Sequence, residues 1–330
     1  MNIVAETKNN ITDHFDGEHF FNSYYLDIDM VSRPGLLART MDFFNSESWP
    51  DAIENRHYEP IFKLTNHSAL VVTYINHATI LIQVDGLNIL TDPIWSPRAS
   101  PLTFVGPRRV RTPGLELTDL PKIDIILLSH NHYDHMDIPT LKILQERDAP
   151  LVITGLGNRA LLQQETINAH ELDWWESTTI DTTSIYFVPA IHGSARGIFD
   201  RNKTLWGGFV IQSTQGNIYF AGDTAYGNHF REIKTRFEPI RLALLPIGHY
   251  LPRWMMQSVH MSPDDAAKAH IDLKSANSIG IHLGIFHGLG SHNSEKLGEP
   301  EADLQKAKNK YAIANKDFYV LDVGESITLK

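Results

Sequence analysis

Four side chains that bind metal ions well lie within six consecutive positions of this sequence. His130, His132, Asp134 and His135 form the pattern H-x-H-x-D-H, directly after a largely apolar run over 123–128. Neutral imidazole and carboxylate are the ligands that zinc, manganese and iron accept when no thiolate is present, and the chain contains no cysteine. Burying these four groups together without a cation would be costly. The cluster therefore predicts a metal site.

Three further candidate ligands occur later in the chain. His192, Asp223 and His282 each stand where a predicted strand gives way to a loop, which is where catalytic groups concentrate on a rigid scaffold. A single histidine among the 17 in this chain is more often a surface or core residue. His192 or His282 alone would therefore not predict a metal ligand. The metal prediction depends on the four-residue cluster.

The elements that must position these groups follow from apolar runs and turn signals. Asp85-Gly86 between two apolar runs predicts a hairpin with a type I′ turn, because Gly accepts a positive φ. The predicted strands cover 70–75, 79–84, 87–90, 123–128, 151–154, 184–188, 208–213, 217–221, 242–246, 278–282 and 318–323.

Helices are predicted between the strands. Ser262 as N-cap, Pro263 at the first helical position and the acidic pair Asp264 and Asp265 mark the start of one helix. Others are predicted over 35–44, 138–146 and 302–314. Two series of strands with interspersed helices predict a layered α/β architecture, in which two sheets are faced by helices.

Composition narrows the classes of protein. The 330 residues suffice for one large domain or two modest ones. With 29 basic and 39 acidic side chains the net charge is −10, which argues against a nucleic-acid partner. We see neither a secretory signal nor an apolar run long enough to span a membrane, so the expected location is cytoplasmic, with export as an effector left open. Residues 1–65 are expected to form an N-terminal extension that packs on a hydrolase domain over 66–330.

Several segments together resemble a known family. The chain is similar to the metallo-β-lactamase fold superfamily and, within it, to the N-acyl-phosphatidylethanolamine-hydrolysing phospholipase D family. The similarity covers roughly Tyr74 to Phe286. Besides the H-x-H-x-D-H loop, it is carried by Leu90-Thr91-Asp92-Pro93-Ile94, Arg98-Ala99-Ser100-Pro101, Glu171-Leu172-Asp173-Trp174-Trp175-Glu176, Ala221-Gly222-Asp223-Thr224 and Pro252-Arg253-Trp254.

The resemblance implies a four-layer αββα sandwich with two Zn²⁺ ions per chain, Mn²⁺ or Fe²⁺ being alternatives. In that scheme the first ion is held by His130, His132 and His192. The second is held by Asp134, His135 and His282, and Asp223 bridges the two. The implied catalytic residues are Asp134, Asp223 and His260.

For three residues near the implied ligands, the sequence leaves two roles open. His260 matches a histidine near the substrate in the family, or it merely precedes a helix. Asp92 and His77 would orient ligand imidazoles, or form turn hydrogen bonds. The chain departs from the family pattern at Asn76, where Gly is usual, and at His249, where a small residue is expected. Similarity also weakens over 284–298.

The implied reaction is of the phospholipase D type. A hydroxide shared by the two ions would attack phosphorus in N-acyl phosphatidylethanolamine, releasing N-acylethanolamine and phosphatidic acid. The alternatives are a dinuclear-metal lactonase or other small ester or phosphoester hydrolase, and a metal-stabilised binding module without turnover. The expected partners are a phospholipid, a membrane surface contacted peripherally, and a second copy in a homodimer. Residues 20–45 would supply an apolar entrance, or pack on the core.

Overall fold

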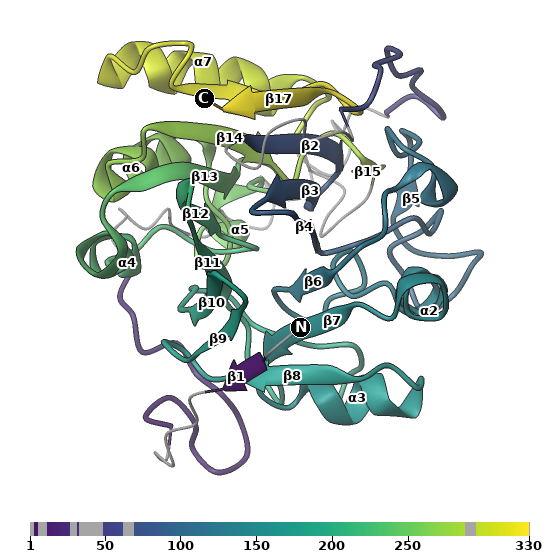
Figure 1. The fold of residues 1–330 in the computed structure, drawn as a ribbon. Coiled ribbons are helices and arrows are strands. Elements are labelled where there is room, and N and C mark those ends of the chain that lie inside the picture. The colour runs from purple at the N-terminus through teal and green to yellow at the C-terminus, as the bar shows by residue number, and fades with distance from the viewer. Residues whose placement is uncertain are drawn as a thin grey trace.

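Two β-sheets packed face to face form the centre of the computed structural model, which describes residues 3–5, 12–26, 32, 49–61, 69–287 and 295–329 (Figure 1). One sheet has eight strands, which are antiparallel from β1 to β12 and parallel from β12 to β16. Its order is β1 (Ile3–Ala5), β9 (Ser177–Ile180), β10 (Thr183–Val188), β11 (Gly208–Ser213), β12 (Gly216–Phe220), β13 (Ile240–Pro246), β14 (Asn277–Ile281) and β16 (Phe318–Val320).

The second sheet has seven strands and the same division into an antiparallel and a parallel half. Its order is β17 (Ser326–Leu329), β2 (Leu70–Asn76), β3 (Thr79–Val84), β4 (Leu87–Thr91), β6 (Ile125–Leu128), β7 (Leu151–Gly155) and β8 (Ala169–Leu172). A small separate pair joins β5 (Arg108–Arg109) to β15 (Phe286–His287).

Helices cover the outer face of each sheet (Figure 1). The second sheet is covered by α2 (Ile138–Asp148) and α3 (Asn158–Gln164), and the first by α4 (His229–Phe237), α6 (Pro263–Leu273) and α7 (Glu299–Tyr311). A 3₁₀ turn (Leu117–Asp119) and the short α5 (Arg253–Met256) complete the set within the described ranges.

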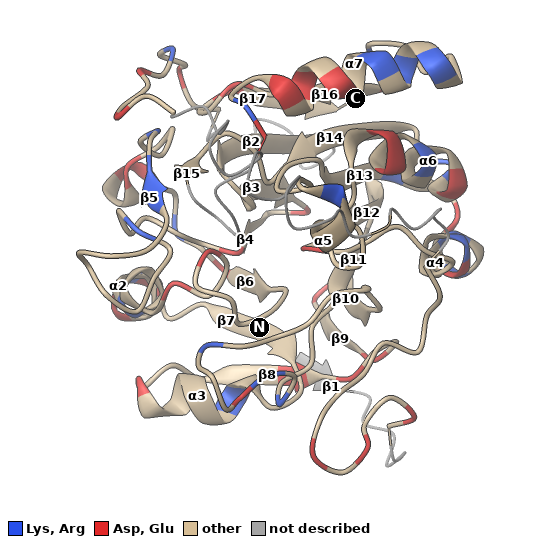
Figure 2. Cartoon of the chain, turned by 180° about the vertical axis from the view of Figure 1, so that it is seen from behind, with Lys and Arg blue, Asp and Glu red and all other residues tan. Residues whose placement is uncertain are grey.

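Three hydrophobic clusters occupy the three interfaces between these layers. One lies between the sheets and includes Phe187 and Phe209, another joins α4 and α6 to the first sheet, and the third joins α2 and α3 to the second sheet. The order of layers is therefore helix, sheet, sheet, helix, and the predicted α/β sandwich is confirmed. Charged side chains gather on the outer helices, such as α6 and α7, while the central strands carry few (Figure 2).

Local sequence signals predicted some elements correctly and missed others. Asp85 and Gly86 have φ of 52° and 80°, as a type I′ turn requires, and Ser262 forms a capping box with Asp265 at the start of α6. The strand predicted over 318–323 ends at Val320. The strands β8, β9 and β17 and the helices α3 and α4 were not predicted, because they are short and only partly apolar. The helix predicted over 35–44 lies outside the described residues.

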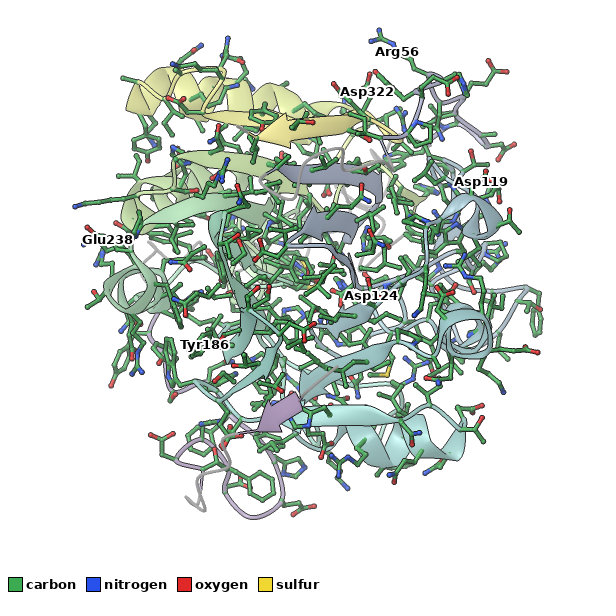
Figure 3. All side chains as sticks on the ribbon, viewed as in Figure 1. Arg56, Asp119, Asp124, Tyr186, Glu238 and Asp322 are labelled. Carbon is green, nitrogen blue, oxygen red and sulfur yellow. The ribbon has the colours of Figure 1, made fainter. Side chains whose placement is uncertain are left out.

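Two described parts of the N-terminal 65 residues contact the core. Arg56 Nη1 lies 3.3 Å from Asp322 Oδ2 at the far end of the chain (both labelled in Figure 3), and Tyr58 donates a hydrogen bond of 2.6 Å to the same oxygen. Asn22 Nδ2 donates to the carbonyl of His192 at 2.9 Å. The division into 1–65 and 66–330 stays a prediction. No helix in the described ranges is both long and apolar enough to cross a bilayer.

Candidate metal centre

The seven predicted ligands lie at the carboxyl-terminal ends of strands from both sheets. β6 of the second sheet leads into the loop that carries His130 to His135, whereas β10, β12 and β14 of the first sheet lead to His192, Asp223 and His282. Gly222 lets the loop after β12 come close, because a Cβ there would lie 2.6 Å from the Cβ of Ser129. The face-to-face packing of the sheets thus brings together side chains that are far apart in sequence.

Three imidazoles form a first group. His130 Nε2 lies 2.8 Å from His132 Nδ1, and His192 Nε2 lies 3.3 Å from the same atom. Outer partners fix two of these rings: His130 Nδ1 is 2.9 Å from Ser129 Oγ, and His192 Nδ1 is 2.9 Å from the carbonyl oxygen of Val259. A ring whose Nδ1 donates outward presents the lone pair of Nε2 inward, as a ligand requires.

A second group contains one carboxylate and two imidazoles. Asp134 Oδ2 lies 3.5 Å from both His135 Nε2 and His282 Nε2. The outer nitrogen of His135, Nδ1, is 2.7 Å from Asp92 Oδ2, which also accepts a hydrogen bond of 2.6 Å from Ser129 Oγ. His77 Nε2 lies 3.1 Å from Asp134 Oδ2. Asp92 therefore contacts a candidate ligand imidazole, as expected from the sequence, whereas His77 contacts the carboxylate of Asp134.

Asp223 lies between the two groups. Its Oδ2 is 3.2 Å from both His135 Nε2 and His282 Nε2, 4.0 Å from His130 Nε2 and 3.8 Å from His192 Nε2. All seven side chains are thus brought to one focus, and Asp223 is the carboxylate that both groups face.

Charges differ between the groups. Burial lowers the pKa of His130 and, to about 3, that of His192, so these rings are neutral. Burial also lowers the pKa of His282, but the charge of Asp223 outweighs it and raises that pKa to about 9. For Asp223 burial acts upward, and His282 and His135 overcome it and hold the pKa well below its usual value. Positive charge at this focus is therefore stabilised by the carboxylates.

The donors fit a divalent cation on chemical grounds. His135 Nε2, His282 Nε2 and Asp223 Oδ1 are buried and make no hydrogen bond with the described residues. Buried polar atoms without partners are rare, and each calls for an explanation such as an ion. Nitrogen and carboxylate donors around a common centre, with imidazoles oriented by outer partners, are the set that zinc accepts.

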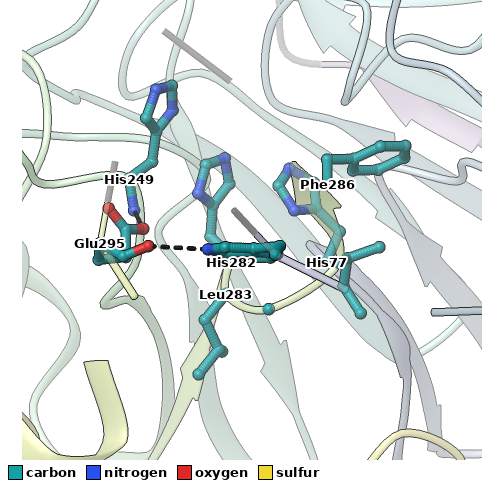
Figure 4. A pocket seen from close by; sticks show the side chains of 9 residues that line it. His77, His249, His282, Leu283, Phe286 and Glu295 are labelled. Carbon is teal, nitrogen blue, oxygen red and sulfur yellow. Dashed lines mark hydrogen bonds between the residues drawn. The ribbon is translucent and has the colours of Figure 1, made fainter. Parts of the chain in front are cut away.

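A small cavity adjoins the second group (Figure 4). It measures about 20 Å³ and is lined by Trp49, His77, His249, His282, Leu283, Gly284, Ile285, Phe286 and Glu295. The His249 ring lies 4.6 Å from that of His260 and 6.0 Å from that of His282, centroid to centroid. His260 Nδ1 lies 3.8 Å from Asp223 Oδ2. His260, the predicted catalytic histidine, therefore borders the same focus.

Two residues beside the centre were missed from the sequence. The Glu295 carboxylate is buried and accepts a hydrogen bond from the backbone N–H of His249, which has a φ of 60° (Figure 4). Arg196 donates at 2.8 Å to the carbonyls of Asn131 and Met136 in the ligand loop. Both come from irregular loops, where no periodic pattern signals a contact.

Known proteins resemble this chain over most of its length. The family described as "Beta-lactamase superfamily domain" matches residues 87–283. The chain is 35% identical to "N-acyl-phosphatidylethanolamine-hydrolyzing phospholipase D 1" of Caenorhabditis elegans, over 79% of this chain and 76% of that protein. It is 37% identical to the mitochondrial N-acyl-phosphatidylethanolamine-hydrolyzing phospholipase D of Saccharomyces cerevisiae, over 71% of this chain and 50% of that protein. Isothiocyanate hydrolase from Delia radicum gut bacteria shares the fold, with a TM-score of 0.59 and 22% identity over 78% of this chain and 98% of that one.

Proposed function

Because this chain belongs to the beta-lactamase superfamily and, within it, to the N-acyl-phosphatidylethanolamine-hydrolysing phospholipase D family, we propose that it hydrolyses N-acyl phosphatidylethanolamine to N-acylethanolamine and phosphatidic acid. One observation carries the proposal: two groups of buried donors face the same oxygen of Asp223. A paired-cation centre of this kind suits displacement at a phosphodiester. We also propose that the protein contacts the membrane surface peripherally and that it forms a homodimer.

The two groups would hold two Zn²⁺ ions, with Mn²⁺ or Fe²⁺ as alternatives. His130, His132 and His192 would hold one, the other would be held by Asp134, His135 and His282, and Asp223 would be shared. When bound, such ions supply Lewis-acid stabilisation of phosphoryl oxygens and lower the pKa of water toward neutrality. Asp92 keeps the His135 ring oriented, through the contact of 2.7 Å between its Oδ2 and His135 Nδ1.

His260 would contact the substrate. Burial, and then the nearby His249, lower the pKa of His260 well below its usual value, so the ring is neutral. Its Nδ1 makes no hydrogen bond with the described residues and lies 3.8 Å from Asp223 Oδ2. A neutral imidazole in this position suits donation of a hydrogen bond to a phosphoryl or leaving oxygen.

The test is to present purified protein with vesicles that contain N-acyl phosphatidylethanolamine and, separately, with an acyl lactone. Products are followed by mass spectrometry. We expect N-acylethanolamine and phosphatidic acid in equal amounts, and neither after chelation. Opening of the lactone without release of N-acylethanolamine would support the alternative hydrolase instead.

A further inference from the structure

Two loops each carry adjacent large apolar side chains that are exposed to solvent. Phe104, between β4 and β5, is 77% exposed, and Leu102 and Val105 beside it are also exposed. Ile198 and Phe199, between β10 and β11, are 86% and 83% exposed. Adjacent apolar side chains that water surrounds mark an interaction site more often than a scattered single residue does.

Both loops are fastened to the segment that carries the candidate ligands. Asp137 accepts hydrogen bonds from the backbone N–H groups of Trp95 and Ser96, at 3.2 and 3.1 Å, where the first loop begins. In the second loop, Arg196 binds the carbonyls of Asn131 and Met136. Both loops are therefore anchored to the same segment, 131–137, which overlaps the loop of candidate ligands.

The charge of these loops is opposite to that of the whole chain. Residues 95–115 and 193–204 hold seven of the 29 Lys and Arg residues but one of the 39 Asp and Glu residues. Arg201 and Lys203 are exposed directly after the second tip, whereas Arg108 in β5 is partly exposed and pairs with Asp51 at 2.6 Å. Apolar tips with basic flanks are complementary to an anionic lipid surface, where acyl chains lie beneath negative headgroups.

We propose that Leu102, Phe104 and Val105 of one loop, and Ile198 and Phe199 of the other, form a docking surface for an anionic phospholipid bilayer. With the tips in the headgroup region, the ligand loop to which both loops are bonded would be held close to the lipid whose phosphodiester is cleaved. The role of this surface in catalysis rests on the proposed function. Its binding to a bilayer is tested with vesicles that lack the proposed substrate.

The absence of cysteine allows a direct measurement. Phe199→Cys is labelled with an environment-sensitive fluorophore, and Ile143→Cys, on the exposed face of α2, is the matched control. Vesicles of phosphatidylcholine, with and without phosphatidylserine, are then added to each labelled protein. We expect emission from position 199 to rise and shift to the blue with phosphatidylserine vesicles only, and emission from position 143 to stay unchanged. Unchanged emission at both positions would overturn the proposal.

Unlabelled variants separate docking from catalysis. We expect Ile198→Ser with Phe199→Ser to weaken binding to phosphatidylserine vesicles by at least about tenfold, and Ile143→Ser to leave it unchanged. Hydrolysis of the water-soluble bis(p-nitrophenyl) phosphate should not change in either variant. Vesicle binding equal to that of the native protein would refute the docking surface. Tip-dependent binding without release of N-acylethanolamine would leave the surface standing and refute only the proposed function.

Discussion

Asp223 is the residue whose loss should matter most, because its Oδ2 is within 4.0 Å of a nitrogen from each group of histidines. An amide at this position would keep the shape but remove the negative charge that holds positive charge at the focus. The seven candidate ligands therefore depend on one carboxylate more than on any single imidazole.

Asp223→Asn is expected to lower both bound metal and phospholipid hydrolysis by at least about a hundredfold, since loss of even an outer partner of a metal ligand costs up to that much. Elemental analysis of the purified variant and a product assay measure the two effects. Asp119→Asn, at an exposed position, is the control and should match the native protein. Full metal content in Asp223→Asn would remove Asp223 from the ligand set.

Glu295 is expected to matter for stability rather than for metal. Glu295→Ala would leave the partly buried N–H of His249 without its acceptor, which costs about 1–3 kcal/mol. Denaturant unfolding should show a free energy lower by that amount, with metal content unchanged. Exposed Glu116→Ala is the matched control. Metal loss in Glu295→Ala would instead show that this carboxylate is a ligand.

At the scale of elements, residues 12–26 are attached to the core by contacts that depend on pH. His14 is buried, its ring stacks on Trp174 at 4.0 Å, and its Nε2 lies 2.9 Å from Asp173 Oδ1. Burial lowers the pKa of His14, but the hydrogen bonds to Asp173 and Asp13 outweigh burial and raise it above 6.5. The charged ring is therefore favoured in the folded state.

The sign of the pH effect follows from that raised pKa. The contribution of His14 is complete below the unfolded pKa, near 6.5, and is lost as pH rises through the folded pKa. We expect the amides of Phe20 and Phe21, which donate to Asn202 and His14 carbonyls, to exchange hydrogen more slowly at about pH 6 than at about pH 9, after correction for intrinsic rates. The difference should vanish in His14→Gln and persist in His19→Gln; its persistence in both would exclude His14 as the cause.

At the scale of the whole molecule, the metal centre joins the two sheets. Its donors come from the loop after β6 in one sheet and from the ends of β10, β12 and β14 in the other. A ligand that binds only the folded state stabilises it by mass action, by about 4 kcal/mol at a thousandfold excess over Kd. A cation at this position should therefore stabilise the packing of one sheet on the other.

Chelation is expected to lower the melting temperature by roughly 10 °C and to abolish hydrolysis. Calorimetry of the native protein, of the chelated protein and of the chelated protein with zinc restored gives the comparison. About two equivalents of metal per chain should restore both properties. A melting temperature that does not respond to chelation would argue against a cation shared by the two sheets.

The sequence by itself determined the elements with strong local signals. The hairpin at Asp85-Gly86 and the start of α6 at Ser262 were predictable, because turn geometry and capping depend on neighbouring residues. The metal-binding pattern H-x-H-x-D-H was also predictable, since four of the candidate ligands share one loop. Weakly patterned elements such as β8 and α3 could not be predicted, because their conformation is fixed by the layers they pack against.

Only the tertiary structure decided how the distant groups meet. His192, Asp223 and His282 are joined to the H-x-H-x-D-H loop by the packing of one sheet on the other, a contact that no local pattern encodes. The same holds for Glu295 beside His249 and for the two loops that are both bonded to the segment 131–137. Local signals depend on sequence neighbours, whereas a site between two sheets depends on long-range burial of apolar faces.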